Sequence, residues 1–487
     1  MIITKGVISM NNRKLELVAD FYEYTMSNGY FAKNMSDTIA YFDVFFRRVP
    51  DGGGYVIAAG LEQVIDYINN LKFDEDEIEY LRRQNKFSEE FLHYLKEFKF
   101  TGDIWAIPEG TVVFPNEPLI TVRAPIIEAQ ILETMLLLTI NHQSLIATKT
   151  SRIVNQAKGR PVMEFGARRA HGIDAAVSGA RAAIIGGAVG TSCTLSAKEY
   201  DVTASGTMAH SWIQMFDSEY EAFKAYAEIY PYDCTLLIDT YNTLESGLPN
   251  AIKVFDEVLK PKGVRPKAVR LDSGDLAYLS KKVREELDKA GYEDCKICAT
   301  NSLDEKTIKE LLEEGAQIDL FGVGENLITA KSEPVFGGVY KLVAVEKDGE
   351  IIPKIKVSET AIKVTNPSYK KVYRFYDKET NKAIADVITL HDEKIPEDEY
   401  TIFDPQDPWK KKKITNYICK ELQEKIFENG KQVYKTPALK QIAKYAQEQL
   451  ETLWDEIKRL EKPHMYYVDL SKDLWILKNN MLNSIYF

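Results

Sequence analysis

The sequence lacks the features of membrane and secreted proteins. Apolar runs such as "TMLLLTI" are far too short to span a bilayer, and the first residues include no apolar signal-peptide segment. Cysteine is scarce, with five in 487 residues, an odd number that argues against a disulfide framework. These absences predict a cytoplasmic protein with no membrane partner.

Metal and redox motifs are also missing. No HxH or HExxH pattern occurs among the six histidines, which argues against a metal hydrolase. Cys295 and Cys298 form a CxxC pair, but "KICATNS" is typical of a strand, in which positions i and i+3 point to opposite faces. The pair therefore indicates buried structural thiols.

Positive charge is in short supply. The formal net charge of −11 disfavours non-specific binding to nucleic acid, which needs clustered Lys and Arg. The only basic block, residues 410–413, is interpreted as a solvated loop. Hydrophobic residues at 45% and charged residues at 28% are ordinary for a globular protein, and the length predicts two or three domains.

A strand and helix pattern repeats from about 160 to 325. Short apolar strings alternate with amphipathic stretches such as "DLAYLSKKVREELDKAG", in which apolar residues recur at helical spacing. This alternation predicts parallel strands joined by helices. The candidate strands are "VMEFG", "GAVGTS", "TMAHS", "TLLIDT", "AVRLDSG", "KICATNS" and "DLFGVG".

Seven such units favour a closed or nearly closed (β/α) barrel, with a doubly wound sheet as the alternative. In either architecture, functional groups are expected at the carboxyl ends of the strands. No lysine occurs there, which argues against a Schiff-base aldolase. The residues that do occur there are Arg168, Arg169, Thr191, Ser192, His210, Asp239, Arg270, Asp272, Asn301, Ser302, Gly322 and Gly324.

Residues of these types suit a polar, anionic ligand. Paired arginines can bind a diphosphate or a carboxylate, and the glycine-rich turns of the last two units can present N–H groups to a phosphate. Asp239 and Asp272 could hold Mg²⁺ or sugar hydroxyls, since both favour carboxylate oxygen. Helix capping explains Ser302 and Asp272 as well, and Phe165 is either a ring-stacking group or a core aromatic.

A series of ordered motifs makes the chain resemble a known family. They are "DFYEYTM", "FRRVP" followed by "GGYVIAAGL", "EFGARRAHG", "GTMAHSW", "VRLDSGDLAYLS" and "FGVGENLITA". From about residue 12 to 375 the sequence resembles the nicotinate phosphoribosyltransferases, a family of type II phosphoribosyltransferases. The resemblance implies an α/β fold with an open-faced sheet domain (10–125 with 336–395) beside an irregular (β/α) barrel (126–335).

The two ends of the chain carry less information. Alternating strings after 336 predict strands that complete the N-terminal sheet. Amphipathic stretches within 396–487, notably "LKQIAKYAQEQLETLWDEIKRL", predict a mainly helical C-terminal region. Residues 1–9 precede Met10 and match no motif.

The resemblance implies a reaction and an assembly. Nicotinate and 5-phosphoribosyl 1-diphosphate are joined to give nicotinate mononucleotide and diphosphate, with ATP hydrolysis coupled to turnover and Mg²⁺ required. The assembly is a homodimer whose active sites lie at the subunit boundary. His210 matches a histidine that ATP phosphorylates transiently, Asp239 the acceptor that holds its imidazole, and Asp272 the carboxylate on the ribose.

The resemblance also assigns substrate-binding roles. Phe165 matches a ring that stacks on the pyridine, and Tyr22 matches the ring that covers the other face from the neighbouring subunit. Arg168 lies close to the ring and the diphosphate, and Arg270 reaches the pyridine substituent. The residues expected to bind phosphate are Arg169, Asn301, Ser302, Gly322 and Gly324.

One position bears on specificity. The related nicotinamide enzyme carries an aspartate after "GT", where this chain has Ser192, whose hydroxyl can donate to a carboxylate. The acid is therefore the expected substrate. The alternatives are a nicotinamide-specific relative and a catalytically silent, nucleotide-binding relative.

Overall fold

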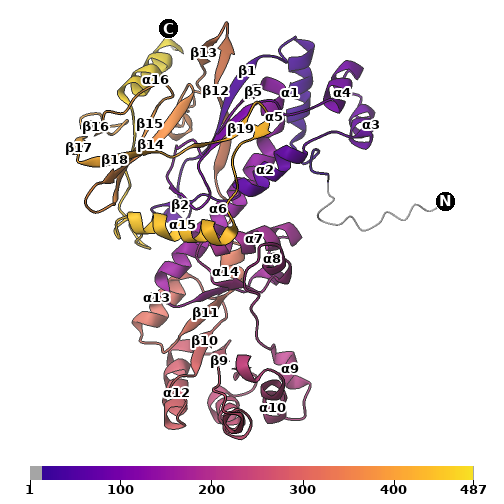
Figure 1. Cartoon of the computed structure of the whole chain (residues 1–487), viewed down its shortest axis with the longest axis vertical. Helices are drawn as coiled ribbons and strands as arrows, with labels where there is room; N and C mark the ends of the chain where they lie inside the picture. Colours follow the sequence, from indigo (N-terminus) through magenta and orange to yellow (C-terminus); the bar gives the residue numbers. More distant parts are fainter. Residues whose placement is uncertain (1–13, 486–487) are drawn as a thin grey trace, which may run out of the picture.

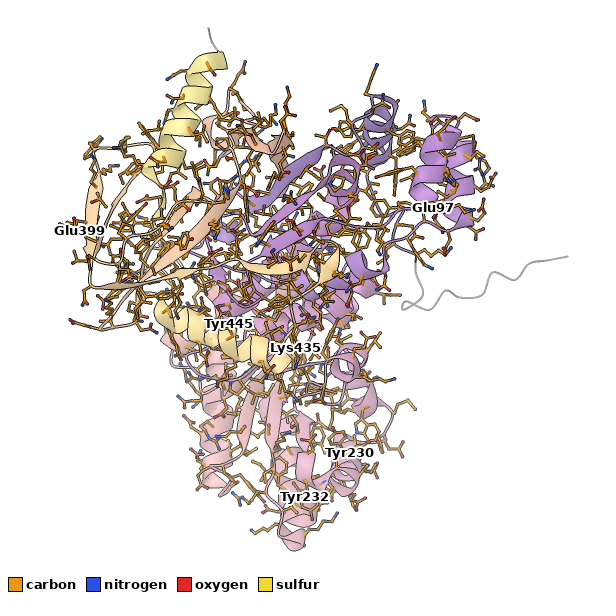
Figure 2. The ribbon with its side chains drawn as sticks, turned by 45° about the horizontal axis from the view of Figure 1, so that its top comes forward. Glu97, Tyr230, Tyr232, Glu399, Lys435 and Tyr445 are labelled. Carbon is orange, nitrogen blue, oxygen red and sulfur yellow. The ribbon has the colours of Figure 1, made fainter. Side chains whose placement is uncertain are left out.

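A computed structural model describes residues 14–485 of the chain (Figure 1). A six-stranded sheet and its helices form one end of an elongated molecule, and a seven-stranded and a four-stranded sheet form the other. Tyr230 and Tyr232 lie towards the tip of the six-stranded end (Figure 2). Within residues 14–485, every helix is too short or too polar to cross a bilayer.

The seven-stranded sheet is antiparallel and draws strands from three separate parts of the chain. Its order is β13 (Glu350–Pro353), β12 (Gly338–Lys347), β1 (Ile39–Phe46), β5 (Ile120–Pro125), β3 (Asp103–Ala106), β19 (Glu424–Glu428) and β20 (Lys431–Gln432). The predicted return of the chain to this sheet is confirmed for β12, which pairs with β1. Two short strands from the same part of the chain, β2 (Val56–Ile57) and β4 (Val112–Val113), form a separate antiparallel pair.

Helices precede and follow these strands. The long helix α6 (Glu133–Gln156) is buried along most of its second half, where many of the buried side chains are polar. The helices of the first third of the chain are α1 (Phe21–Ala32), α2 (Leu61–Asn70), α3 (Glu75–Arg83), α4 (Glu89–Lys96), α5 (Ile126–Ile131) and α6 (Glu133–Gln156).

The six-stranded sheet is parallel throughout, as the strand and helix alternation predicts. Its order is β7 (Gly190–Thr191), β6 (Val162–Glu164), β11 (Leu320–Val323), β10 (Lys296–Ala299), β9 (Ala268–Leu271) and β8 (Thr235–Leu237). Its helices are α7 (Ile173–Ile185), α8 (Thr194–Glu199), α9 (His210–Gln214), α10 (Glu219–Ile229), α11 (Leu248–Val254), α12 (Leu276–Lys289), α13 (Glu305–Glu313) and α14 (Glu325–Ile328).

The strand predicted at "TMAHS" is wrong, and the described strands do not close a barrel. Residues 205–209 have no regular structure, and His210 begins α9. Only an isolated bridge between Thr191 and Ala204 extends the sheet beyond β7. The segment is rich in small and polar residues, and Met208 is the only buried side chain of 201–209, so it lacks the apolar faces of a strand inside a parallel sheet.

The prediction of a mainly helical C-terminal region is also wrong for its first half. Residues 399–432 form β16 (Glu399–Phe403), β17 (Lys411–Thr415), β18 (Tyr417–Glu421), β19 and β20. Strings such as "KKKIT" and "EKIFE" have few apolar residues, so their strand character is weak in sequence. Helices α15 (Leu439–Thr452) and α16 (Lys472–Ile485) follow, and α15 packs against α7 between the two ends of the molecule (Figure 1).

A four-stranded sheet also departs from the prediction for 336–395. Strands β14 (Lys370–Asp377) and β15 (Ala383–Leu390) were expected in the N-terminal sheet. They pair instead with β18 and β21 (Val468–Leu470), in the order β18-β14-β15-β21. The boundaries of the three predicted domains remain a prediction.

A buried ion pair fastens this sheet to the short β2–β4 pair. Arg374 and Asp386 are both fully buried, and Arg374 Nε and Nη2 donate to the two carboxylate oxygens at 2.8 and 2.6 Å. Arg374 Nη2 also donates to the Val112 carbonyl at 2.8 Å, and its guanidinium lies over the Phe114 ring. Both charges are therefore satisfied away from water.

We predict that Arg374→Met lowers the free energy of unfolding by about 3–5 kcal/mol, because it leaves Asp386 buried without its cation. Chemical denaturation measures the loss. Arg459→Met is the matched control, since Arg459 makes a solvent-exposed pair with Glu456 at 3.5 Å; its effect should stay within about 1 kcal/mol. Equal losses in the two variants would contradict the prediction.

Candidate functional site

Three neighbouring parallel strands bring polar side chains to one edge of the sheet. Asp239 follows β8, Asp272 follows β9 and Thr300 follows β10. The register pairs Leu237 with Arg270 and Cys298 with Arg270, so the carboxyl ends of these strands lie level with one another. This edge is the candidate site.

His210 enters the site from the first residue of α9. Its side chain is 40% exposed, Nδ1 lies 3.0 Å from Thr240 Oγ1, and Nε2 lies 3.8 Å from Asp272 Oδ2. One ring nitrogen is thus fixed by a hydroxyl, while the other faces a carboxylate. The imidazole is accessible and held in one orientation.

Arg270, the third residue of β9, links three segments at this edge. Nε donates to Thr300 Oγ1 at 3.0 Å, and Nη2 donates to Asp272 Oδ1 at 2.8 Å. Nη1 donates to Thr207 Oγ1 at 2.9 Å and to the Met208 carbonyl at 3.3 Å. The guanidinium therefore joins β9 and β10 to the segment that leads to His210.

Asp272 remains ionised in this setting. Burial raises the pKa of its carboxyl, but the hydrogen bond from the Thr300 hydroxyl and the charge and hydrogen bond of Arg270 outweigh burial and hold the pKa below its ordinary value. A carboxylate at this edge can accept from a sugar hydroxyl or bind a cation.

The prediction that Asp239 holds the imidazole of His210 is wrong. Asp239 Oδ2 accepts from the Asp272 backbone N–H at 3.1 Å and from the Ser273 hydroxyl, and Thr240 occupies the place expected for it. Asp239 directly precedes Thr240, and the two successive side chains point in different directions. The Asp239 side chain points towards the turn after β9, where Asp272 and Ser273 lie. Asp239 Oδ1 is buried and has no hydrogen-bond partner among the described residues.

Phe165 follows β6 and packs across β11, where Gly322 leaves room for its ring. A Cβ at Gly322 would lie 2.5 Å from Phe165 Cδ2. Gly322 is part of β11, so the prediction that it belongs to a turn is wrong. Gly324 does lie at the turn, where it precedes α14.

The turn after β10 is exposed and has an unusual backbone. Asn301 and Ser302 both have positive φ, at 84° and 51°, the left-handed region that non-glycine residues seldom adopt. Ser302 does not cap α13, contrary to the capping interpretation, because the Asp304 side chain accepts from the N–H groups of Lys306 and Thr307.

The other predicted residues lie around the same edge, with one exception. Arg168 and Arg169 are exposed on the 3₁₀ turn Ala167–Arg169, where Arg169 lies 3.7 Å from Glu325, and Ser192 is exposed after β7. Tyr22 is 43% exposed on α1, at the opposite end of the molecule from β9 and α9 (Figure 1).

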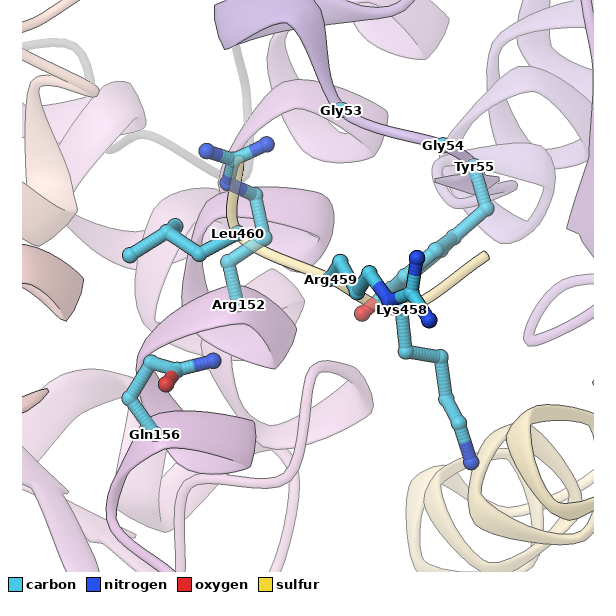
Figure 3. A pocket seen from close by; sticks show the side chains of 8 residues that line it. All are labelled: Gly53, Gly54, Tyr55, Arg152, Gln156, Lys458, Arg459 and Leu460. Carbon is cyan, nitrogen blue, oxygen red and sulfur yellow. The ribbon is translucent and has the colours of Figure 1, made fainter. Parts of the chain in front are cut away.

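A small enclosed pocket lies elsewhere and is not part of this site. It has a volume of about 10 Å³, which is room for one water molecule, and it lies where the loop at Gly53 and Gly54 meets α6 and residues 458–460 (Figure 3). Arg152, at its wall, pairs with Glu305 at 3.3 Å.

Comparison with known proteins agrees with the fold. Three family models match the chain: the nicotinate phosphoribosyltransferase N-terminal domain (17–141), the nicotinate phosphoribosyltransferase family (161–391) and the nicotinate phosphoribosyltransferase C-terminal domain (369–478). The nicotinate phosphoribosyltransferase of Bacillus subtilis is 44% identical over 472 residues, which cover 97% of this chain and 96% of that protein. The chain belongs to the nicotinate phosphoribosyltransferase family.

Other members of the nicotinate phosphoribosyltransferase family extend the likeness. The Mycobacterium tuberculosis protein named nicotinate phosphoribosyltransferase pncB2 is 42% identical over 91% of this chain and 89% of its own length. The crystal structure of human nicotinic acid phosphoribosyltransferase superposes with a TM-score of 0.85 and 27% identity, over 95% of this chain and 99% of that one. The likeness thus covers nearly the whole fold.

Several residues of the site were missed in the sequence. Thr207, Thr240 and Thr300 each bond to a predicted site residue. Glu164 was also missed; it is fully buried, and its carboxylate accepts from Thr191 Oγ1 at 2.6 Å and from the Gly166 backbone N–H. The signal was present for Glu164, Thr240 and Thr300, because each lies within two positions of the carboxyl end of a predicted strand; Thr207 begins the string "TMAHS" and carries no such signal.

We predict that Thr240→Val changes the tautomer populations of the His210 imidazole, whereas Thr240→Ser does not. Loss of one neutral hydrogen bond shifts the ratio of tautomers by about two- to ten-fold. Histidine-selective ¹⁵N NMR can resolve the effect, since the chain has only six histidines, and His210→Ala assigns the signal. Identical spectra for Thr240→Val and the wild type would show that Thr240 does not control the ring.

Proposed function

We propose that this chain joins nicotinate to 5-phosphoribosyl 1-diphosphate, giving nicotinate mononucleotide and diphosphate, with ATP hydrolysis coupled through a phosphohistidine at His210. The observation that carries the proposal is the position of Asp272 at one edge of a parallel sheet, 3.8 Å from the His210 imidazole and 2.8 Å from the Arg270 guanidinium. The names of the relatives supply the substrates.

The ribosyl transfer needs stabilised charge more than covalent chemistry. As diphosphate departs, C1 of the ribose gains positive character, and the negative charge of the leaving group must be held. Asp272, kept ionised by Arg270 and Thr300, suits the ribose hydroxyls. The exposed guanidinium groups of Arg168 and Arg169 suit the diphosphate, and the turns at Asn301, Ser302 and Gly324 suit the 5′-phosphate.

His210 has the geometry of a phosphoryl acceptor. A neutral imidazole has a lone pair on its unprotonated nitrogen, and a hydrogen-bond partner at the other nitrogen fixes which of the two that is. Thr240 holds Nδ1 at 3.0 Å and the ring is 40% exposed, so ATP can reach it. The proton on the ring then determines which nitrogen attacks.

The site fits Mg²⁺. Asp239 Oδ1 is buried with no hydrogen-bond partner among the described residues, and a hard cation would be a favourable partner for this oxygen. Asp239 and Asp272 would hold the ion. Residues 14–485 contain no cluster of three or more His, Cys, Asp or Glu side chains suited to a metal, so substrate phosphates and water would complete its shell. When bound, Mg²⁺ would neutralise charge on the departing diphosphate.

The pyridine ring would stack on Phe165 and, on its other face, on a tyrosine from a second copy of the chain. Tyr22 belongs to α1, at the end of the molecule opposite β9 and α9, and in this proposal it reaches the pyridine from the second subunit of a homodimer. Its exposure leaves it available for that contact. Ser192, exposed after β7, would donate to the carboxylate of nicotinate.

We predict that the purified protein forms nicotinate mononucleotide from nicotinate and 5-phosphoribosyl 1-diphosphate with Mg²⁺, and that ATP raises the rate. His210→Ala should lose the ATP-dependent increase and the acid-labile 80 Da phosphoryl adduct, because the acceptor nitrogen is gone. The matched control is His93→Ala, an exposed histidine of α4. Turnover of nicotinamide alone would favour the nicotinamide-specific alternative, and turnover of neither pyridine would favour a silent relative.

We predict that Ser192→Asp raises the KM for nicotinate about ten-fold or more, since two like charges in a partly dry site repel by at least about 1.4 kcal/mol. Ser192→Asn is the matched control, because asparagine has the size of aspartate without its charge. Steady-state kinetics with each variant measures the difference. Equal KM values for the two variants would assign the effect to size and not to charge.

A further inference from the structure

The segment that precedes His210 is attached by hydrogen bonds near its two ends, and between them only the Met208 side chain is buried in the core. At its start, the Thr191 N–H donates to the Thr203 carbonyl at 3.0 Å and the Ser205 N–H donates to the Thr191 carbonyl at 2.9 Å. At its end, Thr207 and the Met208 carbonyl accept from Arg270. We call residues 203–209 the His210 segment, and the two bonds from Arg270 Nη1 the Arg270 clasp.

Arg270 has almost no spare hydrogen-bonding capacity. A guanidinium has five N–H groups, and the bonds to Thr300, Asp272, Thr207 and Met208 use four of them within the described part of the chain. A carboxylate that binds a guanidinium in the usual paired manner needs two N–H groups. Such a ligand must therefore displace at least one bond that Arg270 makes in this structure.

The bonds of the clasp are the ones that a carboxylate would displace. The bond to Asp272 joins two opposite charges, and the Thr300 hydroxyl is buried at the end of β10. Thr207 and the Met208 carbonyl are neutral acceptors in a segment outside the strands, and they bind more weakly than a carboxylate. Nη1 and Nη2 also form the edge of the guanidinium that a planar carboxylate matches. Occupation of Arg270 by a carboxylate thus opens the clasp.

We propose that Thr207 is a positioning residue that reports occupancy of Arg270 to His210: a carboxylate on Arg270 releases the His210 segment. This inference rests on the proposed function, in which Arg270 receives the carboxylate of nicotinate. Release frees the backbone directly before His210, whose remaining side-chain partners are Thr240 and Asp272. The acid substrate therefore alters the mobility of the residue that takes the phosphoryl group.

Hydrogen exchange of peptides that cover residues 203–212 tests the proposal in the full-length protein. In the wild type, saturating nicotinate should speed exchange of this segment at least two-fold. Thr207→Val should exchange at that faster rate without nicotinate and change little when nicotinate is added, while Thr207→Ser should behave as the wild type. Thr203→Val is the matched control, since it makes the same change at an exposed position of the same segment.

The KM for nicotinate gives a second test, because a purely structural role of Thr207 would not predict a lower KM in its variant. The Thr207 hydroxyl competes with the carboxylate of nicotinate for Arg270 Nη1. Thr207→Val removes this competitor and should lower the KM for nicotinate about two- to ten-fold, the equivalent of one neutral hydrogen bond. Thr207→Ser should restore the wild-type KM. A general loss of structure would instead raise KM and speed exchange throughout the sheet.

The outcomes separate this inference from the proposed function. Exchange of the unliganded Thr207→Val variant that equals the wild type overturns the inference, whatever the enzyme does with nicotinate. A wild-type segment that is unchanged when nicotinate saturates a working enzyme also overturns it. Faster exchange in unliganded Thr207→Val, in a protein that forms no nucleotide, supports the clasp and contradicts the proposed function.

Discussion

The guanidinium of Arg270 is the one group on which the arrangement of the site depends. It is largely buried, and it ties the ends of β9 and β10 to a segment that is not itself a strand. Its charge keeps Asp272 ionised, and Asp272 in turn faces the imidazole of His210. A neutral side chain at 270 would leave the carboxylate without a cation and the segment without its second anchor.

Buried charges also hold the larger parts of the molecule together. Arg181 on α7 is fully buried and meets Glu109 at 2.8 Å, and Lys149 on α6 meets Glu305, the first residue of α13, at the same distance. Each pair joins a helix that precedes or covers the six-stranded sheet to a different part of the chain. Desolvation offsets much of the attraction in such pairs, so they specify geometry more than they add stability.

The sequence predicts those parts of the fold whose patterns are strongly periodic. Alternating apolar strands and amphipathic helices were sufficient for the parallel sheet, whereas "TMAHS" has the length of a strand but not its apolar faces. Among the C-terminal strands, β17 and β19 were missed because lysine and glutamate dominate them. At the site, strand ends located Arg270 and Asp272, but whether Asp239 or Thr240 reaches His210 depends on the direction of two successive side chains, which no pattern records.

The seven-stranded sheet has a consequence for how the chain is made. Its middle strands are synthesised within the first 125 residues, yet the strands that cover its two flanks, β12 and β19, emerge only after residues 338 and 424. The open edges of β1 and β3 are therefore exposed on the ribosome while about 200 to 300 residues are added, at rates of roughly 5–20 residues per second. During those tens of seconds the nascent protein presents unpaired strands to its surroundings, and shielding by a chaperone matters most then.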